Sequence, residues 1–268
     1  IIAAEASSAH YALKLMREFK KSGHEYEFFG VGSDLMEQEG FERFGKSEEM
    51  AVVGAVEILK HLKSLKKIFN KLVEVAHERK PQVVILMDYP EFNLKLAEKL
   101  KPEGLKVFYY ISPQIWAWRQ GRVETIRQFC EKVFLLFPFE VEFYKSKNVA
   151  HEFVGHPLLE DLDPQWLNKN YIQLQKEKYG ITPQHKVLAL MPGSRRGELD
   201  RHFEIQLEVA RRLLKKYDFL RLAILVAPTI KKTEIQDRLE NFKSPYLLLD
   251  NSSNQMIAMA DYVLVEIG

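Results

Sequence analysis

Residues 83–122 read VVILMDYPEFNLKLAEKLKPEGLKVFYYISPQIWAWRQGR and contain one complete βαβ unit. The apolar run at 83–87 is typical of a strand that is buried on both faces of a parallel sheet, and it ends at the charged residue Asp88. A helical pattern follows, and a second strand is expected at 105–111. Because open α/β sheets bind ligands at the carboxyl ends of their strands, this unit predicts a functional site around Asp88.

Strands and helices alternate along the rest of the chain, which is typical of doubly wound parallel sheets. Helices are expected at about 9–21 and from 116 to about 129, and residues 41–52 show no clear period. Residues 158–170 interrupt the alternation, and the pattern then restarts. We therefore expect an α/β fold of two Rossmann-like domains, residues 1–160 and residues 161–268. The last visible element is strand-like, so we expect more chain to follow it and the second domain to be incomplete here.

Composition excludes several classes of protein. The formal net charge of +2 gives no field suited to wrapping nucleic acid. The single cysteine, Cys130, excludes an internal disulfide, and no Cys/His cluster suits a structural zinc site. No run approaches the roughly 18 apolar residues of a spanning helix. The GxxxxGK[ST], GxGxxG and HExxH patterns are absent, so neither a cofactor nor a metal is expected.

A second candidate site follows the predicted strand 186–190. There the chain reads MPGSRRGE before a long helix, with Gly193 allowing close approach and with Arg195 and Arg196 supplying positive charge. Free backbone N–H groups at a helix start, together with arginines, favour binding of a diphosphate. Strand–turn–helix segments with Gly and Ser, such as Ser194, are common, so an ordinary turn is the alternative.

The long helical pattern at 53–78 carries an apolar stripe and a separate face of lysines. Most such helices pack their stripe on a sheet and leave the lysines in solvent. The alternative is a surface that rests on anionic lipid. The first turns have more apolar residues than one buried face requires, so the pattern leaves membrane contact there, by Val52, Val53, Val56 and Leu59, open as the alternative.

Several strings along the chain resemble one known family. AEASS, GVGSDLMEQEGFE, EEMAVVGAVEIL, DYPEFN with SPQIWAWRQGR, and LFPFEVEFY, FVGHPL and LALMPGSRRGEL occur in the order and spacing of lipid-A-disaccharide synthase. The resemblance implies an inverting glycosyltransferase of the two-domain GT-B fold. It would join UDP-2,3-diacylglucosamine to 2,3-diacylglucosamine 1-phosphate by a β-1,6 bond and release UDP, as a peripheral protein on the cytoplasmic face of the bacterial inner membrane.

The resemblance also implies roles for particular residues, and it favours membrane contact by Val52, Val53, Val56 and Leu59. Asp88 is expected to be the general base for the acceptor's 6-hydroxyl, and Arg195 to stabilise the diphosphate as UDP leaves. The other residues expected to bind substrate are Glu5, Ser7, Asn93, Ser112, Trp118, Arg119, Gly193, Ser194 and Arg196. Without the resemblance, Asp88 could equally cap a turn, Trp118 could be a packing residue, and Ser7 or Ser8 could cap a helix.

Two departures from the family leave alternatives open. Ser8 and Ala9 stand where the family has Gly-Asp, and the chain ends where the family begins its uridine-binding segment. A different GT-B enzyme acting on a UDP-sugar, a UDP-sugar epimerase, or a lipid- or sugar-binding module without turnover are the rival functions. An exposed apolar face could be covered either by bound phospholipid or by formation of a homo-oligomer.

Overall fold

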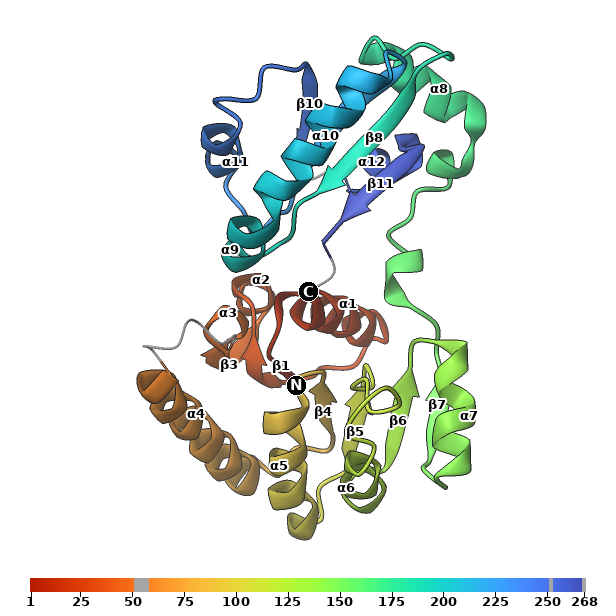
Figure 1. The fold of residues 1–268 in the computed structure, drawn as a ribbon. Helices are drawn as coiled ribbons and strands as arrows, with labels where there is room; N and C mark the ends of the chain where they lie inside the picture. Colours follow the sequence, from red (N-terminus) through yellow and green to blue (C-terminus); the bar gives the residue numbers. More distant parts are fainter. Residues whose placement is uncertain (51–57, 251–252, 267–268) are drawn as a thin grey trace. The chain divides into compact units, whose positions relative to one another are not determined.

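The computed structural model describes residues 1–50, 58–250 and 253–266 (Figure 1). Contacts divide the chain into two compact units, Ile1–Pro157 and Leu158–Gly268. Each unit holds one parallel β-sheet with helices packed on both faces, which confirms the expected α/β fold. The first unit ends close to the expected boundary at residue 160.

The first unit is built on a seven-stranded sheet in the order β3-β2-β1-β4-β5-β6-β7, in which every pair of neighbours is parallel. The strand order reverses between β1 and β4, and this switch point is where such sheets bind ligands. The strands are β1 (Ile2–Ala3), β2 (Phe28–Gly32), β3 (Phe41–Lys46), β4 (Val84–Met87), β5 (Val107–Tyr110), β6 (Lys132–Leu135) and β7 (His151–Phe153). The helices are α1 (Ala6–Lys21), α2 (Asp34–Gln38), α3 (Ser47–Met50), α4 (Ile58–Arg79), α5 (Pro90–Leu100), α6 (Arg122–Phe129) and α7 (Pro138–Ser146).

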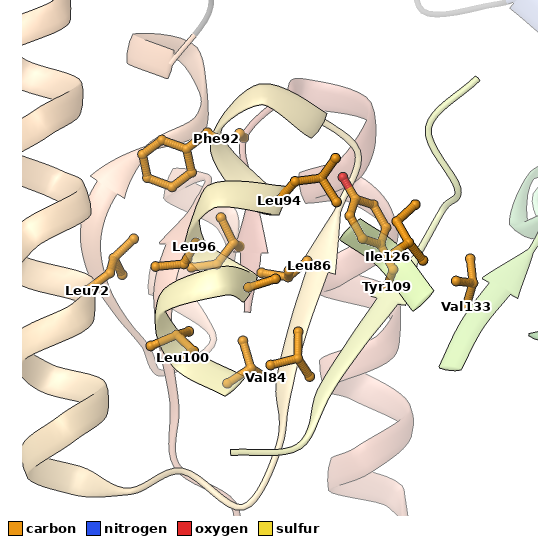
Figure 2. Packing of buried hydrophobic residues seen from close by; sticks show 14 of the residues in the cluster. Leu72, Val84, Leu86, Phe92, Leu94, Leu96, Leu100, Tyr109, Ile126 and Val133 are labelled. Atoms are coloured by element: carbon orange, nitrogen blue, oxygen red, sulfur yellow. The ribbon is translucent and has the colours of Figure 1, made fainter. Parts of the chain in front are cut away.

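Alternate residues of the central strands face opposite sides of this sheet. Leu86 of β4 and Tyr109 of β5 lie in the larger core, which also holds buried residues of α4, α5 and α6. Figure 2 shows this packing, with Leu72 of α4 and Leu96 of α5 on the same side of the sheet. Met87, the next residue along β4, lies in a separate core on the other face with residues of α1 and α2.

The second unit repeats the plan with the strand order β10-β9-β8-β11, again all parallel. Its switch point lies between β8 and β11, beside the turn that follows β8. The strands are β8 (Lys186–Met191), β9 (Leu220–Val226), β10 (Tyr246–Asp250) and β11 (Tyr262–Val265). The helices are α8 (Lys169–Lys178), α9 (Arg196–Glu198), α10 (Glu204–Lys216), α11 (Lys232–Arg238) and α12 (Ser253–Met259), and a π-helical turn, Leu199–Phe203, joins α9 to α10.

The structure differs from the sequence patterns in two places. Residues 41–52 show no clear period in the sequence, yet Phe41–Lys46 form β3, an edge strand with a register shift opposite Gly30 and Val31 of β2. The helix expected from residue 116 begins only at Arg122, because the preceding segment folds into turns and Arg119 has a left-handed backbone with φ of +54°. Trp116 and Trp118 therefore lie on an irregular loop rather than on a helix.

Candidate functional site

The switch point of the first unit brings two carboxyl groups together. β1 pairs with β4 through Ala3 and Met87, so the loops that follow these strands leave the sheet side by side. The side chains of Glu5 and Asp88, one from each loop, interact, and this interaction lowers the pKa of Asp88. The structure thus brings together two of the residues that the sequence analysis selected.

Burial raises the pKa of Asp88 above its usual value, while a hydrogen bond from the Tyr89 backbone N–H and the interaction with Glu5 act in the opposite direction. Desolvation disfavours the ionised form of a carboxyl group, so burial makes its carboxylate a stronger base. A carboxylate with a raised pKa at the mouth of a parallel sheet is suited to accepting a proton from a hydroxyl group.

The backbone at Asp88 and Tyr89 is held in an unusual conformation. Both residues have positive φ, +51° and +44°, in the left-handed region that costs a residue with a Cβ atom on the order of 1 kcal/mol. The Asp88 carbonyl accepts hydrogen bonds from Asn93 Nδ2 at 2.7 Å and from Tyr109 Oη at 2.6 Å. Asn93 Nδ2 also donates to the Met87 carbonyl at 3.1 Å. These bonds hold the turn that carries the Asp88 carboxylate.

Asn93 and Tyr109 support this turn from inside the protein. Both side chains are fully buried, at 0% exposure, and Figure 2 shows Tyr109 beside Leu94 and Ile126 in the core. Neither residue was expected in this role: Asn93 was expected to bind substrate, and Tyr109 was not selected. Their burial and bonding indicate that they position Asp88 from behind.

Tyr89 links the same turn to α3. Its hydroxyl donates to the Met50 carbonyl at 2.9 Å, and Ser47 Oγ, at the start of α3, donates to the Ala3 carbonyl at 2.6 Å. Burial and the nearby charge of Glu5 raise the pKa of Tyr89, so the phenol stays protonated and can donate. The ends of β1, β4 and β3 are thereby tied to one another around the carboxyl pair.

The loop after β1 also contains the departure noted in the sequence. Ser8 is buried at the third position of α1, where its Oγ accepts from the Glu5 N–H at 3.0 Å and donates to the Glu5 carbonyl at 2.9 Å. This half of a capping box explains why α1 begins at Ala6, earlier than expected. Ser7 is exposed and remains available to a ligand, whereas Ser8 holds the Glu5 backbone.

An aromatic and cationic rim follows β5. Trp118 is 55% exposed, and the guanidinium carbons of Arg119 and Arg122 lie 4.6 Å and 5.5 Å from the centre of its ring, which is cation–π geometry. Both arginines also form ion pairs with Glu91 at the start of α5. This rim presents the Trp118 ring and the exposed Arg119 side chain, whereas Arg122 is only 14% exposed and Glu91 offsets part of the positive charge.

Ser112 lies below this rim. It is buried, and its Oγ is 2.6 Å from the Tyr144 hydroxyl and 3.0 Å from the Pro113 carbonyl. The Glu140 side chain, also buried, interacts with the Ser112 hydroxyl and accepts a hydrogen bond from the Phe137 N–H at 3.1 Å. Ser112 was expected to bind substrate, and the structure places it in this internal polar network beneath the loop.

In the second unit, a cavity of about 380 Å³ opens beside the turn after β8. The turn is tight because Gly193 has φ of +117°, a conformation that favours glycine. Arg195 and Arg196 extend outwards with side chains that are 72% and 74% exposed. The lining comprises Met191, Pro192, Gly193, Ser194, Arg195, Glu198, Leu225, Ala227, Pro228, Ser253, Val265 and Glu266.

The expectation that this turn offers free backbone N–H groups was wrong for two of them. The Ser194 and Arg195 N–H groups donate to Glu198 Oε2 at 2.8 Å and 3.1 Å. The Ser194 carbonyl in turn accepts from Thr229 Oγ1 at 2.6 Å. An internal carboxylate therefore satisfies the amides that were expected to bind a diphosphate, and the two arginine side chains remain as the cationic groups.

The residues expected to contact a membrane lie largely beyond what the structure describes. Val52, Val53 and Val56 are outside the described residues, as is the side chain of Leu59 in α4. Further along α4 the apolar stripe is buried in the core, as an ordinary crossover helix would be. Leu62, however, is 54% exposed, in a turn with exposed lysines.

No helix in the part of the chain that the structure describes is both long enough and apolar enough to cross a membrane. Within residues 1–50, 58–250 and 253–266, no three His, Cys, Asp or Glu side chains are grouped to hold a metal ion.

The sequence matches one protein family over its full length. The model of the lipid-A-disaccharide synthetase family matches residues 1–268. A lipid-A-disaccharide synthase of Nitrosococcus oceani is 37% identical over 268 residues, which cover 100% of this chain and 68% of that protein. The corresponding protein of Myxococcus xanthus is 35% identical, with coverage of 100% and 69%.

Solved structures share the fold at much lower identity. The S. aureus MnaA–UDP co-structure has a TM-score of 0.54 and 11% identity, over 87% of this chain and 69% of that chain. A UDP-N-acetylglucosamine 2-epimerase has a TM-score of 0.59 and 10% identity, over 99% of this chain and 72% of that chain. These similarities confirm the two-domain GT-B fold and, at such identities, the fold alone.

Proposed function

This chain belongs to the lipid-A-disaccharide synthase family, and on that basis we propose that it joins UDP-2,3-diacylglucosamine to 2,3-diacylglucosamine 1-phosphate through a β-1,6 bond. The family match over residues 1–268 is the observation that carries this assignment. It favours a glycosyltransferase of lipid A synthesis over the rival epimerase, whose similarity is limited to the fold.

We assign the acceptor side of the reaction to the switch point of the first unit. The Asp88 carboxylate takes the proton from the 6-hydroxyl of the acceptor sugar as its oxygen attacks the anomeric carbon of the donor. The raised pKa of Asp88 and the support of its turn by Asn93 and Tyr109 support this role. Glu5 interacts with Asp88 and is placed to influence its protonation.

The rim after β5 is assigned to binding the acceptor. Trp118, 55% exposed, offers an aromatic ring of the kind that stacks on sugar rings, and the exposed Arg119 side chain suits the acceptor's 1-phosphate. Ser7, exposed at the start of α1, offers a hydroxyl group to the same substrate.

The donor side of the reaction is assigned to the turn after β8. The bond between the anomeric carbon and the diphosphate oxygen breaks, its electron pair leaves with UDP, and the configuration at the anomeric carbon inverts. The Arg195 guanidinium stabilises the negative charge that develops on the diphosphate, and Arg196 adds a second positive charge. Gly193, with its left-handed φ of +117°, allows the tight turn that carries Ser194 and Arg195.

The protein is further proposed to work as a peripheral protein at the cytoplasmic face of the inner membrane. Its substrates carry acyl chains, and the exposed Leu62 lies beside exposed lysines at the start of α4. Apolar side chains that dip into a bilayer, with lysines that meet anionic head groups, are the general means of such binding. The preceding residues Val52, Val53, Val56 and Leu59 would extend this surface.

The test is to incubate the full-length protein with both substrates in detergent, beside the variants Asp88→Ala and Arg195→Ala. We expect disaccharide 1-phosphate and UDP in equal amounts, with kcat at least ~100-fold lower in Asp88→Ala, as for loss of a general base. Glu208→Ala and Arg212→Ala, which break an exposed ion pair on α10, are matched controls that should keep activity. A folded protein without turnover on these substrates would instead indicate a binding module.

A further inference from the structure

We propose that Glu198 is a positioning residue for the donor diphosphate: its carboxylate is a built-in anion that fixes the Ser194–Arg195 turn, so that the diphosphate is bound by the Arg195 side chain and not by the two amides. This inference rests on the proposed function, because it names how the same site holds its nucleotide. It lies wholly within the second unit.

The geometry of the turn supports a fixed carboxylate. One oxygen, Glu198 Oε2, accepts both the Ser194 N–H and the Arg195 N–H, at 2.8 Å and 3.1 Å. The Glu198 side chain is only 10% exposed. On the opposite side, the Thr229 hydroxyl holds the Ser194 carbonyl at 2.6 Å. Both polar groups of the backbone at Ser194 are thus engaged by this chain's own side chains.

Packing also holds the carboxylate in place. Gly193 lies against Glu198, since a Cβ atom at Gly193 would be only 2.7 Å from both Cβ and Oε2 of Glu198. The carboxylate belongs to the first turn of the following helix, so it need not be brought from elsewhere to reach the amides. Hydrogen bonds from N–H groups to an ionised carboxylate are among the stronger ones, and a ligand would have to break two of them to take its place.

The neighbouring charges fit this arrangement. Glu198 Oε1 lies 3.5 Å from a guanidinium nitrogen of Arg195, which keeps the cation near the turn while its side chain stays 72% exposed. Glu266, another carboxylate in the cavity lining, is 3.2 Å from His202 Nε2. Among the described residues, Glu198 is the carboxylate that accepts from the amides of this turn.

Two outcomes of removing the carboxylate separate this proposal from its opposite. If Glu198 positions the turn and Arg195, its loss weakens binding of UDP. If the diphosphate displaces Glu198 from the amides, its loss removes a competitor and strengthens binding of UDP. The sign of the change in affinity therefore decides between the two.

The experiment measures the dissociation constant of UDP by calorimetry for the full-length wild type, Glu198→Ala and Glu198→Gln. We expect Glu198→Ala to weaken UDP binding at least ~10-fold, as for loss of a charged hydrogen-bond partner. Glu198→Gln should retain more affinity, because its amide oxygen can accept the same two N–H groups. Added acetate should partly restore binding in Glu198→Ala, by occupying the vacated position.

The matched control is Glu140→Ala, which removes a buried carboxylate that caps α7 in the first unit by a similar bond. This variant should lower the melting temperature without changing UDP affinity. If Glu198→Ala fails to fold, Glu198→Asp tests the same point, since its carboxylate is one methylene shorter. UDP affinity that is unchanged or tighter in the folded variant would overturn the inference. Failure of the proposed function would give a different result: the wild type would bind UDP but form no disaccharide.

Discussion

A Cβ atom at Gly193 would lie 2.7 Å from the Cβ atom of Glu198, closer than such atoms approach in proteins. Gly193 also has φ of +117°, a backbone conformation that residues with side chains rarely adopt. A larger residue at this position would therefore force Glu198 or the backbone to shift, and the contact links Gly193 to the carboxylate that accepts from the amides of the turn.

Gly193→Ala should destabilise the second unit and weaken UDP binding, because the new methyl group must displace Glu198 or distort the turn. The backbone strain alone costs at least ~1 kcal/mol. Thermal unfolding and UDP calorimetry measure the two effects. Gly197→Ala is the matched control: its Cβ would meet no atom within 4 Å, so it should be neutral or slightly stabilising in the helix. Equal melting temperatures for both variants would contradict this account of the turn.

Tyr109→Phe should lower kcat more than it changes the KM of either substrate. It removes the 2.6 Å hydrogen bond to the Asp88 carbonyl and so loosens the turn that carries the base. The loss of a buried hydrogen bond also costs ~1 kcal/mol of stability. Tyr144→Phe serves as the control, since it removes a buried hydroxyl bound to Ser112 in the same domain. It should cost similar stability and leave kcat nearly intact; equal kcat losses would argue against a specific role for Tyr109.

Asp88→Asn should abolish turnover and leave the protein at least as stable as the wild type at pH 7. Burial raises the pKa of Asp88, so folding favours its protonated form. That stabilisation is complete below the unfolded pKa of about 3.9 and is lost as pH rises through the higher folded pKa. The ionised, buried carboxylate therefore opposes folding at neutral pH, and the neutral amide does not. Unfolding curves at pH 5 and pH 8 test this: the variant's advantage should grow with pH.

Glu5→Ala should move the acid limb of the kcat/KM profile to higher pH. The interaction with Glu5 lowers the pKa of Asp88, whereas desolvation raises it. Removal of Glu5 should therefore raise the pKa of Asp88 further. Glu5→Gln should move the limb less, because its amide can still donate to the Asp88 carboxylate. Glu18→Ala, which breaks an exposed ion pair on α1, is the control and should leave the profile in place. An acid limb that stays at the same pH in Glu5→Ala would indicate that the essential base is a residue other than Asp88.

Leu62→Glu should weaken binding to vesicles that contain anionic phospholipid. The substitution puts a negative charge on the exposed start of α4, among lysines proposed to meet head groups. Co-sedimentation with vesicles measures the bound fraction. Leu174→Glu is the control, since Leu174 is similarly exposed, at 58%, on α8 of the second unit. If both variants bind as the wild type does, the membrane surface does not include α4.

The sequence indicated the architecture because its signals are local. The buried strand before Asp88 and the strand before Gly193 are continuous apolar runs, and both end at a switch point. β3 could not be predicted from the sequence, because this edge strand contains Glu42 and Arg43 and so lacks a continuous apolar run. The Trp118 loop was mistaken for a helix, since its apolar spacing does not reveal the left-handed backbone at Arg119.

The supporting residues of the site could not be found in the same way. Tyr109 lies in a strand and looks like any core aromatic, and its bond to the Asp88 carbonyl depends on the pairing of β5 with β4. Glu198 did have a local signal, because a glutamate at the third position of a helix commonly accepts from the N-cap amide. Applying that rule to the turn would have shown that its amides are already satisfied.

Libraries screened for heat resistance alone will favour glycine at position 88. Asp88 keeps a left-handed backbone that glycine adopts without strain, so the substitution would relieve on the order of 1 kcal/mol. At position 88 the same substitution deletes the carboxyl group assigned as the base. A selection for thermostable variants must therefore also require formation of the disaccharide. Without that requirement, the selected variants will be stable but catalytically inactive.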